Sequence, residues 1–198
     1  MKISILLPYK ENFSPIYPGA VSLFVKDTSR LSKYKKNIIV YGNTDFKKTF
    51  NLKYKNIPLK KSLLKSQSKL YVSEFIKLQK FNKSTLIEVH NRPYYIKLIK
   101  LKLNKKLVLY FHNDPLSMAG SKTVIERLDL ISLCSKIIFN SQWTKNRFLT
   151  GLDKFKNASE KLEVIQQSST KTNINILKKK KIITFTGKLN SAKGYDLF

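Results

Sequence analysis

Short apolar runs alternate with segments of helical periodicity along most of the chain. Seven runs rich in β-branched and aromatic residues predict buried strands, over residues 3–7, 37–41, 85–89, 107–111, 136–139, 163–165 and 182–185. Apolar residues at helical spacing predict helices starting near residue 20 and over 62–81, 93–103, 123–134 and 143–149. A short patch at 57–59 fits an edge strand. This alternation predicts an α/β fold, a parallel sheet covered by helices on both faces.

The segment 107–115 joins a buried strand to a polar triplet. It reads Leu-Val-Leu-Tyr-Phe-His-Asn-Asp-Pro, so His112, Asn113 and Asp114 follow the strand directly. Ligands of open α/β sheets bind outside the carboxyl ends of the strands. We therefore treat the triplet as a candidate site, with local capping of the strand end as an equal alternative.

Other predicted strand ends also carry polar groups. The strand over 85–89 is followed by His90, Asn91 and Arg92, and Ser141 after the strand at 136–139 is a natural helix N-cap. Gly19 stands at a helix entrance, where free N–H groups favour an anion or a sugar hydroxyl, although a plain turn is the simpler interpretation. Together these groups predict a rim that borders a small-molecule cleft.

Composition excludes several classes of protein. Hydrophobic residues make up 42% of the 198 residues, which is enough for a core. No apolar run approaches the roughly 20 residues of a membrane span, and the first residues read as a strand rather than a signal peptide. Cys134 is the single cysteine, so no internal disulfide can form. A cytoplasmic location fits these features.

The formal net charge of +27 suggests a polyanionic partner. Only four of the 39 basic residues are arginine, the residue suited to bidentate phosphate recognition. We therefore favour a solvated lysine-rich surface without a specific nucleic acid. Peripheral contact with an anionic membrane surface is a further expectation.

Metal and hydrolase chemistry have little support in the sequence. His90 and His112 lie on different predicted strands without the spacing of metal ligands, and no cysteine cluster exists. No Gly-x-Ser-x-Gly turn is present. We expect no metal and no cofactor.

The segment 182–198 combines a strand, a Gly-Lys turn and the opening of a helix. Lys188 and Lys193 flank this turn, where two ammonium groups can converge on a diphosphate. A strand with the start of one helix is an incomplete domain, so we expect the sequence to stop short of a second domain.

These motifs together resemble a GT-B glycosyltransferase of family 4. The resemblance rests on Gly-Lys-Leu at 187–189 with Lys-Gly at 193–194, on Pro-Gly-Ala at 18–20, and on the strand ends at 89–93, 110–115 and 138–141. It implies a Rossmann-like doubly wound parallel sheet, the N-terminal half of a GT-B fold. The implied domains are an acceptor-side domain over 1–167, a linker over 168–181 and the start of a truncated donor domain over 182–198.

The resemblance also implies an activity and a set of site residues. The activity is retaining transfer of a sugar from a nucleotide-sugar to a cell-envelope glycan or glycolipid, as in lipopolysaccharide or related polysaccharide biosynthesis, without a metal. The implied residues are His112 near the reacting centre, Lys188, Lys193 and Gly19 at the donor phosphates, and Asn91, Arg92, Asn113 and Asp114 at the acceptor.

Two departures from the family pattern qualify this expectation. Ile-Gln-Gln-Ser at 165–168 replaces a common Pro-Asn-Gly turn, and the donor half with its acidic pair is absent, so the chain alone should be nearly inactive. The implied location is cytoplasmic, at the inner face of the membrane. The alternatives are a basic nucleic-acid-binding module and a non-catalytic α/β binding domain.

Overall fold

A computed structural model describes residues 1–59, 66–152 and 160–168 of the chain. The chain divides into two compact units, Met1–Gln167 and Ser168–Phe198, and the description below concerns the first. Almost all of the predicted linker and the whole segment 182–198, with Lys188 and Lys193, lie outside the described residues.

The described part forms one sheet of parallel strands. The strands are β1 (Ile3–Leu6), β2 (Ile38–Gly42), β3 (Tyr54–Asn56), β4 (Leu86–His90), β5 (Lys106–Phe111), β6 (Lys136–Phe139) and β7 (Leu162–Val164). Their order across the sheet is β3-β2-β1-β4-β5-β6-β7, and every neighbouring pair is parallel. This is the predicted Rossmann-like fold.

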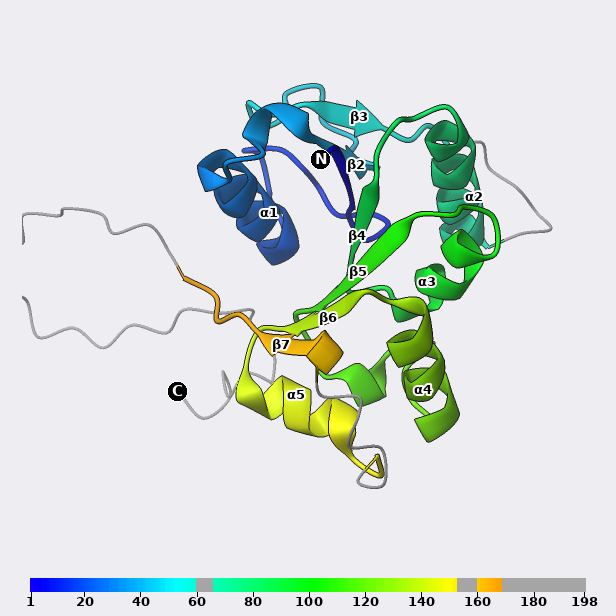
Figure 1. Ribbon diagram of the computed structural model, residues 1–198. Coiled ribbons are helices and arrows are strands. Elements are labelled where there is room, and N and C mark those ends of the chain that lie inside the picture. Colours follow the sequence, from blue (N-terminus) through cyan, green and yellow to red (C-terminus); the bar gives the residue numbers. More distant parts are fainter. Residues whose placement is uncertain (60–65, 153–159, 169–198) are drawn as a thin grey trace, which may run out of the picture. The chain divides into compact units, whose positions relative to one another are not determined.

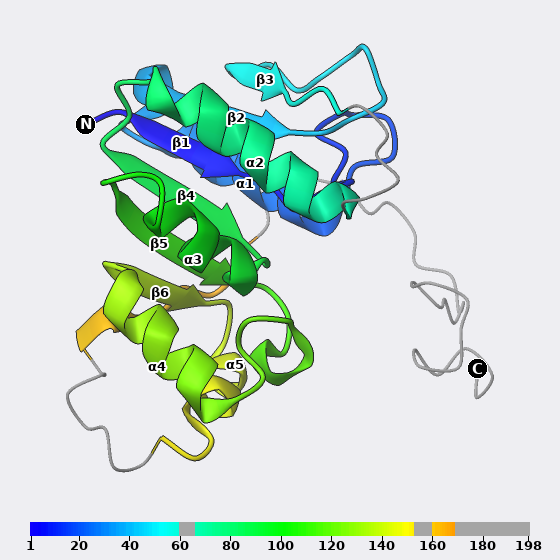
Figure 2. The ribbon, with the colours of Figure 1, turned by 90° about the vertical axis from the view of Figure 1, so that its right-hand side faces the viewer.

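Helices connect the strands and cover both sides of the sheet, which separates two cores. They are α1 (Ala20–Leu31), α2 (Gln67–Lys80), α3 (Pro93–Lys100), α4 (Val124–Leu133) and α5 (Gln142–Leu149), with short 3-10 turns η1 (Lys35–Asn37) and η2 (Pro115–Ser117). Figure 1 shows α1 on one side of the sheet and α2 and α3 on the other, and Figure 2 looks onto the side that carries α2, α3 and α4. Strand residues alternate between the two sides, as the two-residue period of a strand requires.

The smaller core lies under α1, where Val21 and Val25 pack against β1 and β2. The larger core lies on the opposite side and takes in buried residues of α2, α3 and α4. Phe148 of α5 belongs to it and packs on Phe111 and Phe139, with ring centroids 5.7 and 5.3 Å away. Each core consists of the apolar residues whose spacing along the sequence predicts the helices and strands.

Local chemistry explains the helix starts. Thr123 and Glu126 form a reciprocal capping box at α4, and Ser66 and Ser141 cap α2 and α5 with their side chains. Pro93 occupies the first turn of α3, where its missing N–H costs nothing. The predicted edge strand at 57–59 is wrong by three residues: the strand lies just before Pro58, which has no N–H to donate to a ladder.

The strand order creates one switch point. The chain leaves β1 through α1 toward β2, and it leaves β4 through α3 toward β5 on the opposite side of β1. The carboxyl ends of adjacent β1 and β4 are therefore where an open α/β sheet offers its binding crevice. None of the helices in the described part of the chain is both long and apolar enough to cross a membrane.

Candidate functional site at the strand ends

A chain of four hydrogen-bonded side chains runs along the carboxyl ends of β4 and β5. The Nδ1 atom of His90 lies 2.8 Å from Nε2 of His112, and Nε2 of His90 lies 2.6 Å from Oε1 of Glu88. At the other end, Nε2 of Gln167 lies 2.6 Å from Nδ1 of His112. We call these four residues the histidine relay.

Strand register explains why the two histidines meet. Glu88 and His90 are two residues apart on β4, so their side chains leave the same face of the sheet. His90 pairs with Tyr110 across β4 and β5, and His112 follows Tyr110 by two residues. His112 therefore leaves the sheet on the side of His90, even though 22 positions separate them.

The partners in the relay determine which nitrogen donates and which accepts in each hydrogen bond. A carboxylate only accepts, so His90 donates from Nε2 to Glu88 and accepts at Nδ1. His112 then donates from Nε2 and accepts at Nδ1, where the amide of Gln167 donates. This tautomer is inferred from the hydrogen-bond network. It leaves His112 with one acceptor nitrogen on the side of Gln167.

Burial keeps His112 uncharged. Desolvation, and next the nearby His90, lower the pKa of His112 to about 3. His90 itself is fully buried. The His112 ring is therefore a neutral acceptor near pH 7, suited to orienting a hydroxyl group and unsuited to neutralising a phosphate.

Aromatic rings hold the His112 ring from two sides. Tyr110 stacks on it with ring centroids 4.5 Å apart and an interplanar angle of 18°. Phe24 of α1 meets it edge to face at 5.0 Å. The Tyr110 hydroxyl donates to the carbonyl of Ile165 at 2.9 Å, which ties β5 to the segment that carries Gln167.

Two asparagines clamp the backbone of His112. The N–H of His112 donates to Oδ1 of Asn91 at 2.8 Å, and its carbonyl accepts from Nδ2 of Asn140 at 2.8 Å. Asn91 is 8% exposed and adopts a φ of 51°, a left-handed conformation that asparagine tolerates better than most residues. The residues that follow β4 and β6 thus set the position of the residue that follows β5.

The structure brings Asn91 and Asn113 together with His112. Asn91 donates from Nδ2 to Oδ1 of Asn113 at 3.0 Å, and Asn113 is exposed beside it. Arg92 is half-buried and donates to the carbonyl of Asn91 at 2.7 Å. Of the predicted acceptor residues, Asn113 offers the most accessible polar side chain.

Asp114 has no hydrogen bond to the relay in the described part of the chain, and its partners lie in the loop and in α5. It accepts from the N–H of Leu116 at the start of η2 and forms a two-nitrogen ion pair with Arg147 of α5, at 3.0 to 3.3 Å. The hydrogen bond from Arg147 holds the pKa of Asp114 below its usual value. Asp114 therefore fits the alternative interpretation, in which the polar triplet caps the local backbone. The role of Asp114 in binding an acceptor sugar stays a prediction.

Glu11 occupies the helix entrance at Gly19. Gly19 is the N-cap of α1, as predicted, and the N–H of Ser22 donates to Oε1 of Glu11 at 2.9 Å. A Cβ atom on Gly19 would collide with the Glu11 carboxylate. The first turn of α1 thus already binds an anionic group from the chain itself, and a phosphate there would have to displace it.

Sequence reasoning missed Glu88, Gln167 and the clamp by Asn140. The period-two alternation of β4 was a usable signal, because it places Glu88 on the face of His90. His90 belongs to one strand and His112 follows another, as predicted, but the sequence does not predict that register brings their rings into contact. Gln167 is 55 positions from His112 and carries no local signal.

The ring nitrogens of the relay, two each in His90 and His112, are all engaged in hydrogen bonds. No group of three or more His, Cys, Asp or Glu side chains within residues 1–59, 66–152 and 160–168 is arranged to hold a metal ion.

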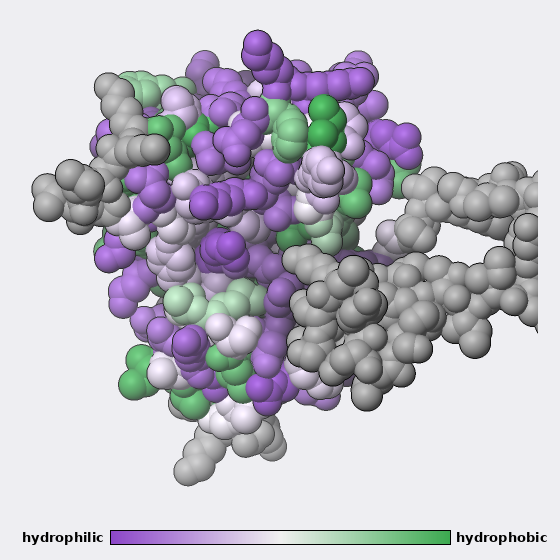
Figure 3. Space-filling view, turned by 180° about the vertical axis from the view of Figure 1, so that it is seen from behind, coloured by the Kyte–Doolittle hydropathy of each residue, from purple (hydrophilic) through white to green (hydrophobic). Residues whose placement is uncertain are grey.

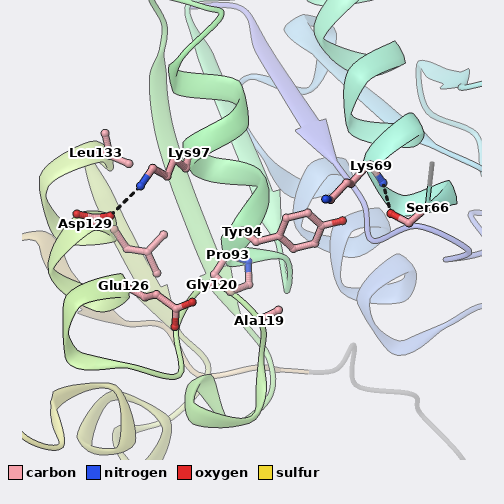
Figure 4. Close-up of a pocket in the computed structure, with 11 residues that line it drawn as sticks. Ser66, Lys69, Pro93, Tyr94, Lys97, Ala119, Gly120, Glu126, Asp129 and Leu133 are labelled. Carbon is pink, nitrogen blue, oxygen red and sulfur yellow. Dashed lines mark hydrogen bonds and ion pairs between the residues drawn. The ribbon is translucent and has the colours of Figure 1, made fainter. Parts of the chain in front are cut away.

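A hollow of about 510 Å³ lies between helices on the side of the sheet opposite to the relay. Figure 4 shows it between α2, α3 and α4, with Tyr94 between its two sides. Gly120 has a φ of 91° and packs so closely on Tyr94 that any side chain there would strike its backbone. Lys97 and Asp129 pair at 3.3 Å on its wall. None of the relay residues lines this hollow.

The chain is similar to known proteins in structure but not detectably in sequence. No protein-family model matches the sequence, and no curated protein matches it. The crystal structure of Anabaena Alr3699/HepE in complex with UDP-glucose is similar over 84% of this chain and 44% of that chain, with a TM-score of 0.52 and 14% identity. The HepE complex with UDP gives the same coverage and TM-score, with 18% identity.

A UDP-GlcNAc 2-epimerase from Methanocaldococcus jannaschii has a lower TM-score of 0.46 and 14% identity, over 83% of this chain and 45% of that chain, and we base no conclusion on it. The chain spans less than half the length of these structures. The likeness to HepE bears on the fold, and it confirms the predicted Rossmann-like α/β class.

The lowered pKa of His112 predicts acid sensitivity. An unfolded histidine has a pKa of about 6.5. Between that value and the folded value of about 3, the unfolded chain binds the additional proton, so the free energy of unfolding falls as the pH is lowered through this range. His112→Gln removes this contribution, and urea titrations should show a flatter dependence on pH for the variant. Equal slopes for both proteins would contradict the lowered pKa.

The left-handed backbone of Asn91 predicts that a glycine variant is more stable than an alanine variant at this position. Asn91→Gly and Asn91→Ala both lose the hydrogen bonds to His112 and Asn113, but only alanine strains the left-handed backbone. Asn91→Ala should therefore lower the free energy of unfolding by about 1 kcal/mol more than Asn91→Gly, in urea titrations at pH 7. An alanine variant as stable as the glycine variant would show that the backbone conformation carries no constraint.

Proposed function

We propose that the chain is part of a nucleotide-sugar-dependent enzyme, a retaining glycosyltransferase that transfers a sugar to a cell-envelope glycan or glycolipid. The observation that carries this proposal is the neutral, clamped His112 ring beside the switch point of a Rossmann-like sheet. Crevices at such switch points bind nucleotides and related ligands. HepE, which has a similar fold, was crystallised with UDP and UDP-glucose, and this supports a nucleotide-sugar as the donor.

Gln167 marks the direction from which a substrate hydroxyl would approach His112. Its exposed amide donates to Nδ1, the acceptor nitrogen of His112, whereas Nε2 of His112 donates to His90. A sugar hydroxyl that takes the place of this amide would make the same hydrogen bond. The proposed role of His112 is to orient this hydroxyl, and Glu88 and His90 are positioning residues that set its tautomer.

The acceptor side of the proposed site has a second polar group beside His112. Asn113 is exposed and its backbone follows His112 directly, so it is the first candidate for a further hydrogen bond to the acceptor. Lipopolysaccharide or a related polysaccharide is the acceptor class that we propose.

The donor side of the proposed site depends on residues beyond the described part. Lys188 and Lys193 are proposed to bind the donor diphosphate and to stabilise the charge that develops as it leaves. The neutral His112 cannot take this role, so a cationic partner is needed for the leaving group. Gly19 remains a weaker candidate, since Glu11 occupies its helix entrance.

The experiment measures sugar transfer from a panel of UDP-sugars to cell-envelope glycans, with the complete product of the gene. His112→Ala should lower kcat by about 100-fold, the loss expected when a reacting group is no longer held in position. Glu88→Gln should lower kcat less, because an amide oxygen still accepts from His90. Lys97→Ala, on the far hollow, is the matched control and should keep full activity.

Thermal unfolding of each variant separates loss of chemistry from loss of fold. Full turnover by a folded His112→Ala variant would overturn the role of His112. Absence of both UDP-sugar binding and transfer in the unmodified protein would overturn the proposed function and favour a non-catalytic binding domain.

A further inference from the structure

The basic residues are concentrated at the edge of the sheet where the strands begin. We call the described segments 1–3, 30–38, 52–54, 80–86, 100–106, 133–136 and 160–162 the strand-start edge. They contain fourteen basic residues, Lys2, Arg30, Lys33, Lys35, Lys36, Lys53, Lys80, Lys83, Lys100, Lys102, Lys105, Lys106, Lys136 and Lys161, and one acidic residue, Glu160. Eleven of the fourteen are exposed and three are half-buried.

Topology brings these segments together. Each segment enters a strand of a wholly parallel sheet, so all of them meet at one edge. Figure 2 shows the end of α2 and the start of β1 on the same side. Two hollows confirm the proximity: one is lined by Lys2, Lys36 and Lys53, the other by Lys100, Lys105 and Lys106, and Ser84 lines both.

The acidic residues of the described part lie mostly elsewhere. Apart from Glu160 they are Glu11, Asp27, Asp45, Glu74, Glu88, Asp114, Glu126, Asp129 and Glu163. Within the described ranges, Lys136 is the single member of the basic set in an ion pair, with Glu163. The strand-start edge therefore keeps an uncompensated positive charge, which a merely lysine-rich composition spread over the whole surface would not produce.

Three exposed apolar side chains project among these lysines. Leu31, Phe81 and Leu101 are the last or capping residues of α1, α2 and α3, and they are 77%, 91% and 70% exposed. The helices run against the strands, so these three helix ends share the strand-start edge with the lysines. The set combines cationic charge with apolar anchors, as interfacial surfaces do.

We propose that the strand-start edge binds the surface of an anionic lipid bilayer. Lysines act as point charges toward anionic headgroups, and Leu31, Phe81 and Leu101 would enter the headgroup region. Nucleic acid fits less well, because thirteen of the fourteen cations are lysine and bidentate phosphate contacts use arginine. The proposal is independent of sugar transfer, and it leaves the strand-end site with the relay free.

Figure 3 shows the molecule from the side opposite to Figure 1, where hydrophobic residues form separate patches on a mainly hydrophilic surface. The strand-start edge is distinguished by the coincidence of an excess of basic residues with exposed apolar helix ends. A test must separate these two contributions.

The test measures co-sedimentation of the whole chain with vesicles of phosphatidylcholine alone or with about one third phosphatidylserine, at low and physiological salt. We expect binding to the anionic vesicles only. The variant Lys36→Gln, Lys100→Gln, Lys102→Gln, Lys106→Gln should bind at least tenfold more weakly. The matched control, Lys47→Gln, Lys48→Gln, Lys55→Gln, Lys122→Gln, removes the same charge from other exposed lysines and should bind within about twofold of the unmodified chain.

A second variant tests the apolar anchors. Phe81→Ser with Leu101→Ser keeps the charge and alters only exposed side chains, so it should fold normally and lose several-fold in binding at physiological salt. Equal losses for both lysine variants would overturn the proposal and leave bulk charge as the cause. Tighter binding to RNA or DNA than to anionic vesicles at physiological salt would overturn it in favour of a nucleic-acid surface.

Discussion

The parallel pairing of β4 with β5 is the interaction on which the candidate site depends. Its register sets His90 opposite Tyr110 and so brings His112 beside His90. A shift of one residue would turn these side chains to the other face, into the large core. Burial, followed by the nearby His90, lowers the pKa of His112, and Phe24 is one of the rings that contact it. The carboxylate of Glu88 accepts from His90, which sets the direction of the hydrogen bonds. One backbone ladder thus determines position, tautomer and charge.

The parallel sheet also separates two kinds of chemistry. Strand ends gather the relay, the asparagine clamp and the entrance of α1, where polar side chains, two carboxylates among them, are held by hydrogen bonds. Strand starts gather lysines and exposed apolar helix ends. A parallel fold makes this division possible because every connection returns from one edge to the other. The proposed sugar site and the proposed membrane surface therefore lie at opposite edges of the sheet.

The sequence predicts the fold well because its signals are local. Apolar periodicity, Pro93 and the capping residues Ser66, Thr123 and Ser141 identify most elements within a few residues. Only part of the candidate site can be predicted from the sequence. His112 follows from its place after a buried strand, whereas its contact with His90 needs a register that one sequence does not encode visibly. The pairing of Asp114 with Arg147 and the carboxylate of Glu11 over Gly19 are likewise products of tertiary packing.

The state of the His112 ring is the central claim, and nitrogen-15 NMR of the histidine side chains tests it most directly. The relay predicts a neutral ring protonated on Nε2, unchanged from pH 7 down to about pH 5, where an exposed histidine with a pKa of about 6.5 would be charged. Assignment of the signal uses the His112→Gln variant. A charged His112 ring at pH 5, or a proton on Nδ1 at pH 7, would contradict the account.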